Sequence, residues 1–273
     1  MSYTAHKMKT VSGKDTSIIG IGSWGIGGFA HRDMKLTSRL EDDIYIDALT
    51  YTLSKGINFT EIALGYGQGA ALPLFKRAVD KSPLVREDIF ITHSLYPRDL
   101  ASIEVVKEDI DGFYKIMDTD YADSTLVTHS MIMIFGEDKV YPLLHSLLQS
   151  GKTRYVSLSN GSPKGITAFK AEFGDKFIAH EGHLSFEIRA LQDKGVFEKC
   201  EELGVKNIIW RPLRQNKTAK MKWKLIEELS DKYGKKPNQI VLTWICSLGY
   251  NPMALSTTTG HIDENIAATE FKM

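Results

Sequence analysis

The chain has 273 residues, of which 42% are hydrophobic and 25% charged, and its 34 basic residues balance its 34 acidic ones. A net charge of zero gives no reason to expect a nucleic acid or an anionic membrane as a partner. No apolar run approaches eighteen residues, and the N-terminus carries no apolar segment of the secretory type. We therefore expect a cytoplasmic protein with no membrane span.

The chemistry-bearing residues give no support for a metal site. The two cysteines, Cys200 and Cys246, lie in helical apolar patterns and lack CxxC spacing, so we interpret them as small buried hydrophobes. The histidines form neither an HxxxH nor an HEXXH pattern.

The N-terminal segment predicts a hairpin followed by a glycine-rich strand end. Two β-like runs, residues 8–11 and 16–19, flank a turn that contains Gly13. Five glycines then occur between Gly20 and Gly28, where the backbone must turn sharply or approach something closely. No helix follows directly, so the glycine pattern does not meet the dinucleotide-binding fingerprint.

From Ile19 onward, predicted strands and helices alternate eight times. After that first strand, the predicted strands are residues 56–61, 89–92, 124–129, 155–159, 177–181, 207–210 and 252–256. The predicted helices are residues 41–55, 68–79, 103–117, 138–148, one starting at 162, 195–203, 223–233, 237–247 and 262–271. Continuous apolar strands are typical of a parallel sheet covered on both sides. The pattern predicts an α/β fold, a (β/α)8 TIM barrel in one domain over residues 1–273, with the N-terminal hairpin at its bottom.

The stretch from Gly56 to Gly69 holds the best candidate for chemistry. Glu61 and Tyr66 are expected where a strand stops and its loop begins, and parallel α/β sheets build their sites at that end. An acid beside a phenol suggests proton transfer.

Five stretches, in this order and spacing, resemble the aldo-keto reductase family along almost the whole chain. They are Ile19–Trp24, Gly56–Gly67, Gly151–Asn160, Trp210–Leu213 and the pair Glu264–Asn265. The resemblance implies a hydride transfer between a nicotinamide dinucleotide, NADP or NAD, and a small carbonyl or alcohol substrate.

The family uses a Tyr as general acid, an Asp–Lys pair beside it and a His that orients the carbonyl. By resemblance, Tyr66 is the acid, and Glu61 replaces the Asp with a side chain one methylene longer. The Lys position holds Ser94, so the cation that would lower the phenol pKa is missing there. His129 stands one residue after the usual His position, which Thr128 occupies. Since strand side chains alternate, we expect His93 to face the helices if Ser94 faces the barrel.

The resemblance also implies a set of cofactor contacts. Ser159 and Asn160 match the carboxamide-binding pair, Glu181 stands where the family usually has Gln, and Trp210 would stack on the nicotinamide. The other implied contacts are Gly22, Trp24, Ser256, Glu264 and Asn265. Leu255 and His261 replace a Lys and an Arg, which argues against a tight preference for the 2′-phosphate.

Structural readings and two other functions stay open at this point. Trp24 and Trp210 could simply pack the barrel mouth, His129 could be an ordinary core or loop histidine, and Glu264 could cap the last helix or form a salt bridge within it. On the same barrel, Glu61, Tyr66 and His129 could serve a non-redox lyase, dehydratase or isomerase. The chain could also be a catalytically silent binding subunit.

Overall fold

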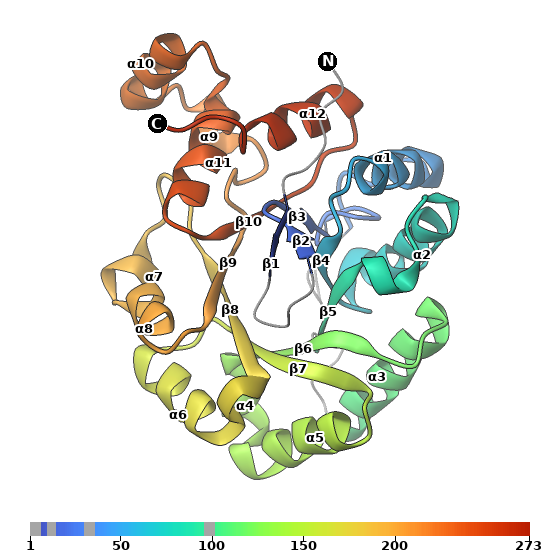
Figure 1. Ribbon diagram of the computed structural model, residues 1–273. Coiled ribbons are helices and arrows are strands. Elements are labelled where there is room, and N and C mark those ends of the chain that lie inside the picture. Colours follow the sequence, from blue (N-terminus) through green and yellow to red (C-terminus); the bar gives the residue numbers. More distant parts are fainter. Residues whose placement is uncertain (1–6, 10–14, 30–35, 96–101) are drawn as a thin grey trace.

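The fold is a closed barrel of eight parallel strands surrounded by helices, as the sequence predicts (Figure 1). It is described from a computed structural model, which covers residues 7–9, 15–29, 36–95 and 102–273. The strands follow one another around the barrel in chain order, and the last strand, β10, closes on the first, β3. Each strand therefore ends at the same rim, where the loops that follow it can form a site.

The barrel strands are β3 (Gly20–Gly22), β4 (Phe59–Ile62), β5 (Phe90–Ser94), β6 (Ala122–Thr128), β7 (Thr153–Ser159), β8 (Phe177–His183), β9 (Lys206–Trp210) and β10 (Asn251–Ala254). The helices are α1 (Asp42–Ser54), α2 (Ala71–Lys81), α3 (Ile103–Met117), α4 (His129–Phe135), α5 (Glu137–Gln149), α6 (Pro163–Phe173), α7 (Ala190–Asp193), α8 (Val196–Glu202), α9 (Lys217–Lys220), α10 (Lys224–Tyr233), α11 (Pro237–Ser247) and α12 (Thr259–Ala267). Short 3₁₀ turns are η1 (Tyr66–Gly69), η2 (Arg86–Asp88) and η3 (Gly174–Lys176).

Side chains alternate between the barrel interior and the helix layer along each strand. In β4, Phe59 joins a small apolar cluster inside the barrel, whereas Ile62 packs into the large core shared with the helices. The parallel register pairs Phe59 with Phe90 and Glu61 with Thr92. Inward positions thus run from aromatic at the lower end of the barrel to polar at the upper rim.

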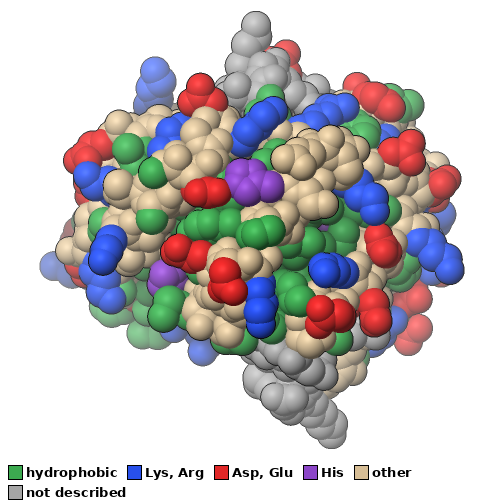
Figure 2. All heavy atoms as spheres, turned by 90° about the horizontal axis from the view of Figure 1, so that it is seen from below, with side chains coloured by type: hydrophobic (Ala, Val, Ile, Leu, Met, Phe, Trp, Pro, Cys, Tyr) green, Lys and Arg blue, Asp and Glu red, His purple; other side chains and the backbone are tan. Residues whose placement is uncertain are grey.

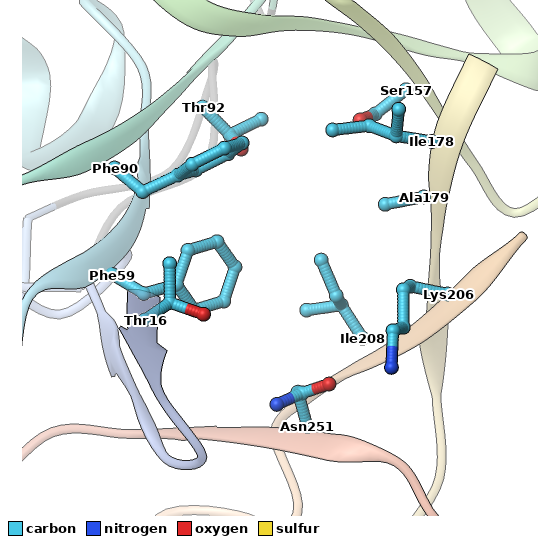
Figure 3. A pocket seen from close by; sticks show the side chains of 10 residues that line it. All are labelled: Thr16, Phe59, Phe90, Thr92, Ser157, Ile178, Ala179, Lys206, Ile208 and Asn251. Carbon is cyan, nitrogen blue, oxygen red and sulfur yellow. The ribbon is translucent and has the colours of Figure 1, made fainter. Parts of the chain in front are cut away.

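The N-terminal hairpin, β1 (Lys7–Lys9) and β2 (Asp15–Ser17), covers the lower end of the barrel. Asn58, just before β4, accepts a 2.8 Å hydrogen bond from the Ser17 amide and donates a 3.0 Å one to the Asp15 carbonyl. Thr16 and the inward side chains of the strands surround a small cavity of about 40 Å³ (Figure 3). The predicted position of the hairpin is confirmed, but its turn, residues 10–14, lies outside the described residues.

Several predicted element boundaries are wrong, including the following three. The predicted helix at 68–79 begins only at Ala71, because η1 precedes it. The predicted last helix ends at Ala267 and not at 271. The predicted strand 124–129 stops at Thr128, whose Oγ1 accepts a 3.1 Å hydrogen bond from the Met131 amide. This N-cap turns the chain, so His129 becomes the first residue of α4.

On the one face that Figure 2 shows, charges of a single sign are not concentrated. On the face seen from below in Figure 1, Lys and Arg side chains are mixed with Asp and Glu (Figure 2). Within the described ranges, no helix combines the length and the apolar character that crossing a bilayer requires.

Candidate active site

A cavity of about 450 Å³ opens at the upper rim, where the barrel strands end. That volume lies within the usual range for small-molecule sites. The residues predicted from the sequence that line it are Gly22, Trp24, Glu61, Tyr66, Ser159, Asn160, Glu181, Trp210, Ser256 and Asn265. The rim of one barrel therefore gathers side chains that are up to 243 positions apart in the sequence, from Gly22 to Asn265.

Tyr66 and Glu61 meet in this cavity. The Tyr66 hydroxyl donates a 2.8 Å hydrogen bond to Glu61 Oε1. The turn that presents Tyr66 requires Gly67, whose φ is +57° and whose missing Cβ would lie 2.4 Å from the Ile26 carbonyl oxygen. The glycine after Tyr66 is thus explained by a close approach of two loops at the site.

Burial dominates the electrostatics of this pair. It raises the pKa of Glu61 to about 7, although hydrogen bonds from Tyr66, Ser94 and Ser23 oppose the shift. Burial, and then the Glu61 charge, raise the pKa of the Tyr66 phenol well above 10. Burial and the Glu61 charge likewise raise the pKa of Glu181. Near pH 7, Glu61 is therefore divided between its charged and its neutral form, and the Tyr66 phenol keeps its proton.

Ser94 lines the cavity, and His93 points away from it. The His93 ring is buried and stacks on Phe113 of α3, with 4.0 Å between ring centroids. Burial lowers the pKa of His93 to about 3, so the ring is neutral. The expected alternation is therefore present: Ser94 faces the cavity, and its neighbour His93 belongs to the helix layer.

Thr128 lines the cavity, whereas His129 does not. The His129 ring lies beside α6, where a Cβ on Gly165 would be 3.6 Å from its Nδ1. The cap at Thr128 explains this position, because it sends the next side chain into the helix layer. The structure does not bring His129 together with Glu61 and Tyr66.

Glu264 also lies away from the cavity. Its carboxylate pairs with Lys236 at the start of α11, and its backbone carbonyl accepts a 3.0 Å hydrogen bond from the Gln239 side chain. Its neighbour Asn265 does line the cavity. Of this predicted pair, one residue faces the site and the other joins two helices.

The structure adds two arginines, Arg211 and Arg214, that the sequence did not single out as binding residues. The Arg211 guanidinium lies 5.1 Å from the centre of the Trp24 ring, and Arg214 pairs with Glu187 at 3.6 Å. Arg211 Nε is buried without a hydrogen-bond partner among the described residues. The sequence did contain a signal for them, because Arg211 and Arg214 follow directly after the predicted strand 207–210.

The loop that carries the two arginines, residues 211–216, has an unusual backbone conformation. Arg214, Gln215 and Asn216 are consecutive non-glycine residues with positive φ, and Arg211 has positive φ as well. Such conformations cost about 1 kcal/mol or more each and persist where the surrounding structure holds them. The Thr218 hydroxyl donates a 3.0 Å hydrogen bond to Glu187, which ties the loop to the segment after β8.

The arrangement fits a dinucleotide. Arg211 and Arg214 supply donors of the kind that bind phosphate, although Leu255 and His261 at the rim supply neither a Lys nor an Arg. Trp210 lines the cavity and stacks on His183, with 4.4 Å between ring centroids. Ser159 and Asn160 offer the hydroxyl and the amide that hydrogen-bond to a neutral carboxamide.

Comparison with known sequences agrees with this geometry. The chain is 25% identical over 239 residues to a methylglyoxal reductase, DkgB, of Yersinia pestis, which covers 86% of this chain and 85% of that protein. It is 24% identical over 297 residues to a probable aldo-keto reductase of Glycine max, covering 96% of this chain and 83% of that one.

Solved structures show the same fold. A thermostable aldo-keto reductase crystallised with the inhibitor epalrestat superposes with a TM-score of 0.83 at 24% identity, covering 98% of this chain and 95% of that one. An aldo-keto reductase of Klebsiella pneumoniae in complex with NADPH gives a TM-score of 0.80 at 17% identity, covering 99% and 91%. The sequence profile of the aldo/keto reductase family matches residues 18–273, and the chain belongs to that family.

Proposed function

We propose that the protein is an NAD(P)H-dependent oxidoreductase that reduces an aldehyde or ketone to an alcohol, with Tyr66 as the proton donor. The observation that carries this proposal is the Tyr66–Glu61 hydrogen bond of 2.8 Å at the rim cavity of an aldo-keto reductase barrel. A bound reduced nicotinamide supplies the hydride.

The side chains around the cavity donate the proton, contact the substrate and hold the cofactor. Tyr66 donates its proton to the carbonyl oxygen, and Glu61 holds the phenol in place by accepting its hydrogen bond. Thr128 and Ser94 offer hydroxyls to the substrate side of the cavity. Ser159, Asn160 and Trp210 hold the nicotinamide end of the cofactor, and Arg211 and Arg214 hold its phosphates.

The raised pKa of Tyr66 makes the reaction slow unless a cation reaches the site. A phenol donates a proton more readily when its phenolate is stabilised, and Glu61 does the opposite by adding negative charge. We therefore expect a turnover well below that of an enzyme with an ammonium beside its tyrosine.

Cofactor binding and turnover test the proposal separately. NADPH or NADH should quench tryptophan fluorescence, since Trp24 and Trp210 line the cavity. Trp210→Phe should reduce the quenching, whereas Trp244→Phe, outside the cavity, should not. A panel of aldehydes and ketones should consume reduced nicotinamide, and Tyr66→Phe should lower that rate by about 10²–10⁴-fold without loss of cofactor binding. No quenching at millimolar cofactor would refute the proposal.

The carboxyl pair supports one second candidate, a non-redox lyase, dehydratase or isomerase. Glu61 and Glu181 share the cavity with Tyr66, and the pKa of Glu61, raised to about 7, suits a group that gives and takes protons near neutral pH. Turnover of a hydroxy or keto compound without nicotinamide, lost in Glu61→Gln, would favour this function over reduction.

A further inference from the structure

The floor of the cavity holds two buried carboxyl groups. Glu61 comes from β4 and Glu181 from β8, and the two residues are 5% and 2% exposed. Ser94 of β5 lines the same cavity, and its hydroxyl hydrogen-bonds to Glu61 and Tyr66. Among the residues that the structure describes, none forms an ion pair with either carboxyl group.

The chain leaves one carboxyl atom of this floor without a partner. Glu181 Oε1 is buried, and no hydrogen-bond donor from the described ranges reaches it. A buried carboxylate without a compensating cation or hydrogen bond is expensive. A long basic side chain at position 94 would supply a cation to these carboxyl groups, but the chain has a serine there.

We propose that this floor binds a primary ammonium group, and that the preferred bearer of that group is the carbonyl substrate itself. The inference rests on the function proposed above. An ammonium has three donors, which match Glu61, Glu181 and the Ser94 hydroxyl. A quaternary ammonium has no donor to offer and would not satisfy the carboxyl groups.

The site geometry limits the distance between the amine and the carbonyl. Tyr66 Oη lies 2.8 Å from Glu61 Oε1. An ammonium bound to Glu61 is therefore within about two hydrogen-bond lengths, ~6 Å, of the hydroxyl that protonates the substrate. That distance suits a short amino ketone or amino aldehyde with one to three carbons between the two groups.

The step is balanced as an ordinary carbonyl reduction. The carbonyl carbon accepts a hydride from the reduced nicotinamide, and the oxygen accepts the proton of Tyr66, which water later replaces. The products are an amino alcohol and the oxidised nicotinamide, and the ammonium keeps its protons. Its charge stabilises the Tyr66 phenolate, as the ammonium of a lysine would.

The first test compares two isosteric ketones. Aminoacetone carries an ammonium where 2-butanone carries a methyl group. We expect kcat/KM for aminoacetone to exceed that for 2-butanone at least tenfold in the wild type. Ser94→Lys should abolish the preference by raising the rate with 2-butanone. Ser94→Met, of similar length but uncharged, should abolish it without raising that rate.

The second test measures binding without cofactor. Methylammonium chloride should raise the melting temperature by about 2–4 °C at saturation, relative to equimolar tetramethylammonium chloride. Glu61→Gln and Glu181→Gln should each reduce the rise. If methylammonium also accelerates reduction of 2-butanone severalfold, a free amine can occupy the floor in place of a substrate-borne one.

The two tests separate this inference from the proposed function. Equal kcat/KM for the two ketones, together with no methylammonium shift, overturns the ammonium site while carbonyl reduction stands. A methylammonium shift without NADPH binding or carbonyl reduction supports the ammonium site and refutes the reductase. If Glu181→Gln alters NADPH affinity but leaves the ketone preference unchanged, Glu181 serves the cofactor and the ammonium site fails.

Discussion

Two buried carboxyl clusters at opposite ends of the same barrel differ in their charge balance. Near the lower end, Asp123 of β6 is 1% exposed and accepts a 2.9 Å hydrogen bond from Arg86, with Arg154 at 3.6 Å. Near the upper end, Glu61 and Glu181 are as deeply buried but have no ion pair within the described part of the chain. The lower carboxylate is compensated by the chain, and the upper ones are not.

The difference distinguishes a carboxylate that is buried to hold two strands together from carboxyl groups that are buried in a candidate active site. Asp123 also accepts a 3.0 Å hydrogen bond from the Ile91 amide, so it fixes β5 against β6. Glu61 instead accepts the hydrogen bond of a phenol that lines a cavity. Buried groups with strongly shifted pKa values concentrate at functional sites, and here they lie at the open rim.

The largest effect should come from removing the cation of the lower cluster. Arg86→Met leaves the Asp123 carboxylate buried with only the more distant Arg154, and should lower the free energy of unfolding by about 3–5 kcal/mol. Urea denaturation measures the change. Lys76→Met, which removes a helix-surface pair with Asp80, is the control and should cost less than about 1 kcal/mol. Equal effects of the two variants would refute the contrast.

Removing the Glu61 carboxyl should favour the folded state as the pH rises, whereas removing Arg86 should destabilise it. Because the pKa of Glu61 is raised to about 7 in the folded protein, the folded state binds more protons than the unfolded state between pH ~4.5 and ~7. Its contribution to stability is therefore complete below pH ~4.5 and falls as the pH rises to ~7. The groups that face it are Tyr66, Ser94, Ser23 and Glu181.

Glu61→Gln removes this dependence. We expect the variant to gain about 1–3 kcal/mol relative to the wild type as the pH rises from 4.5 to 8, measured by urea denaturation at each pH. Carbonyl reduction should fall in the same variant. Glu228→Gln, on the exposed surface of α10, is the control and should leave carbonyl reduction unchanged. A wild type that gains stability over Glu61→Gln as the pH rises would contradict the assignment.

The cations at the cavity rim should matter for binding more than for stability. Arg211→Met should weaken NADPH binding about tenfold, ~1.4 kcal/mol, because it removes a guanidinium with an unpaired buried Nε. Fluorescence titration measures the change. Arg189→Met removes an arginine that stacks on Trp244 outside the cavity, and it should leave NADPH affinity unaltered.

The smallest effect should come from His93, the outward neighbour of Ser94. His93→Leu removes a neutral ring whose Nδ1 has no hydrogen-bond partner among the described residues. The lost stacking on Phe113 and the lost desolvation cost oppose each other, so stability should change by less than about 1 kcal/mol. A large loss of carbonyl reduction in this variant would place His93 at the site.

Strand and helix patterns, and hence the barrel, could be predicted from the sequence because they depend on local periodicity. The family was recognised separately, from the order and spacing of five stretches that resemble it. The same holds for the position of Tyr66, since the strand that ends near Glu61 and the glycines around Tyr66 place it at the rim. Alternation along β5 also predicted correctly that Ser94 and His93 face opposite sides.

The tertiary structure decided what lies beside Tyr66. Because Thr128 caps α4, the His129 side chain lies in the helix layer. Glu264 pairs with Lys236, so its side chain does not face the cavity that its neighbour Asn265 lines. A loop with four non-glycine residues of positive φ brought Arg211 and Arg214 to the cavity. Local patterns determine where a chain turns, but contacts between distant segments decide which side chain faces the site and which charges remain unpaired there.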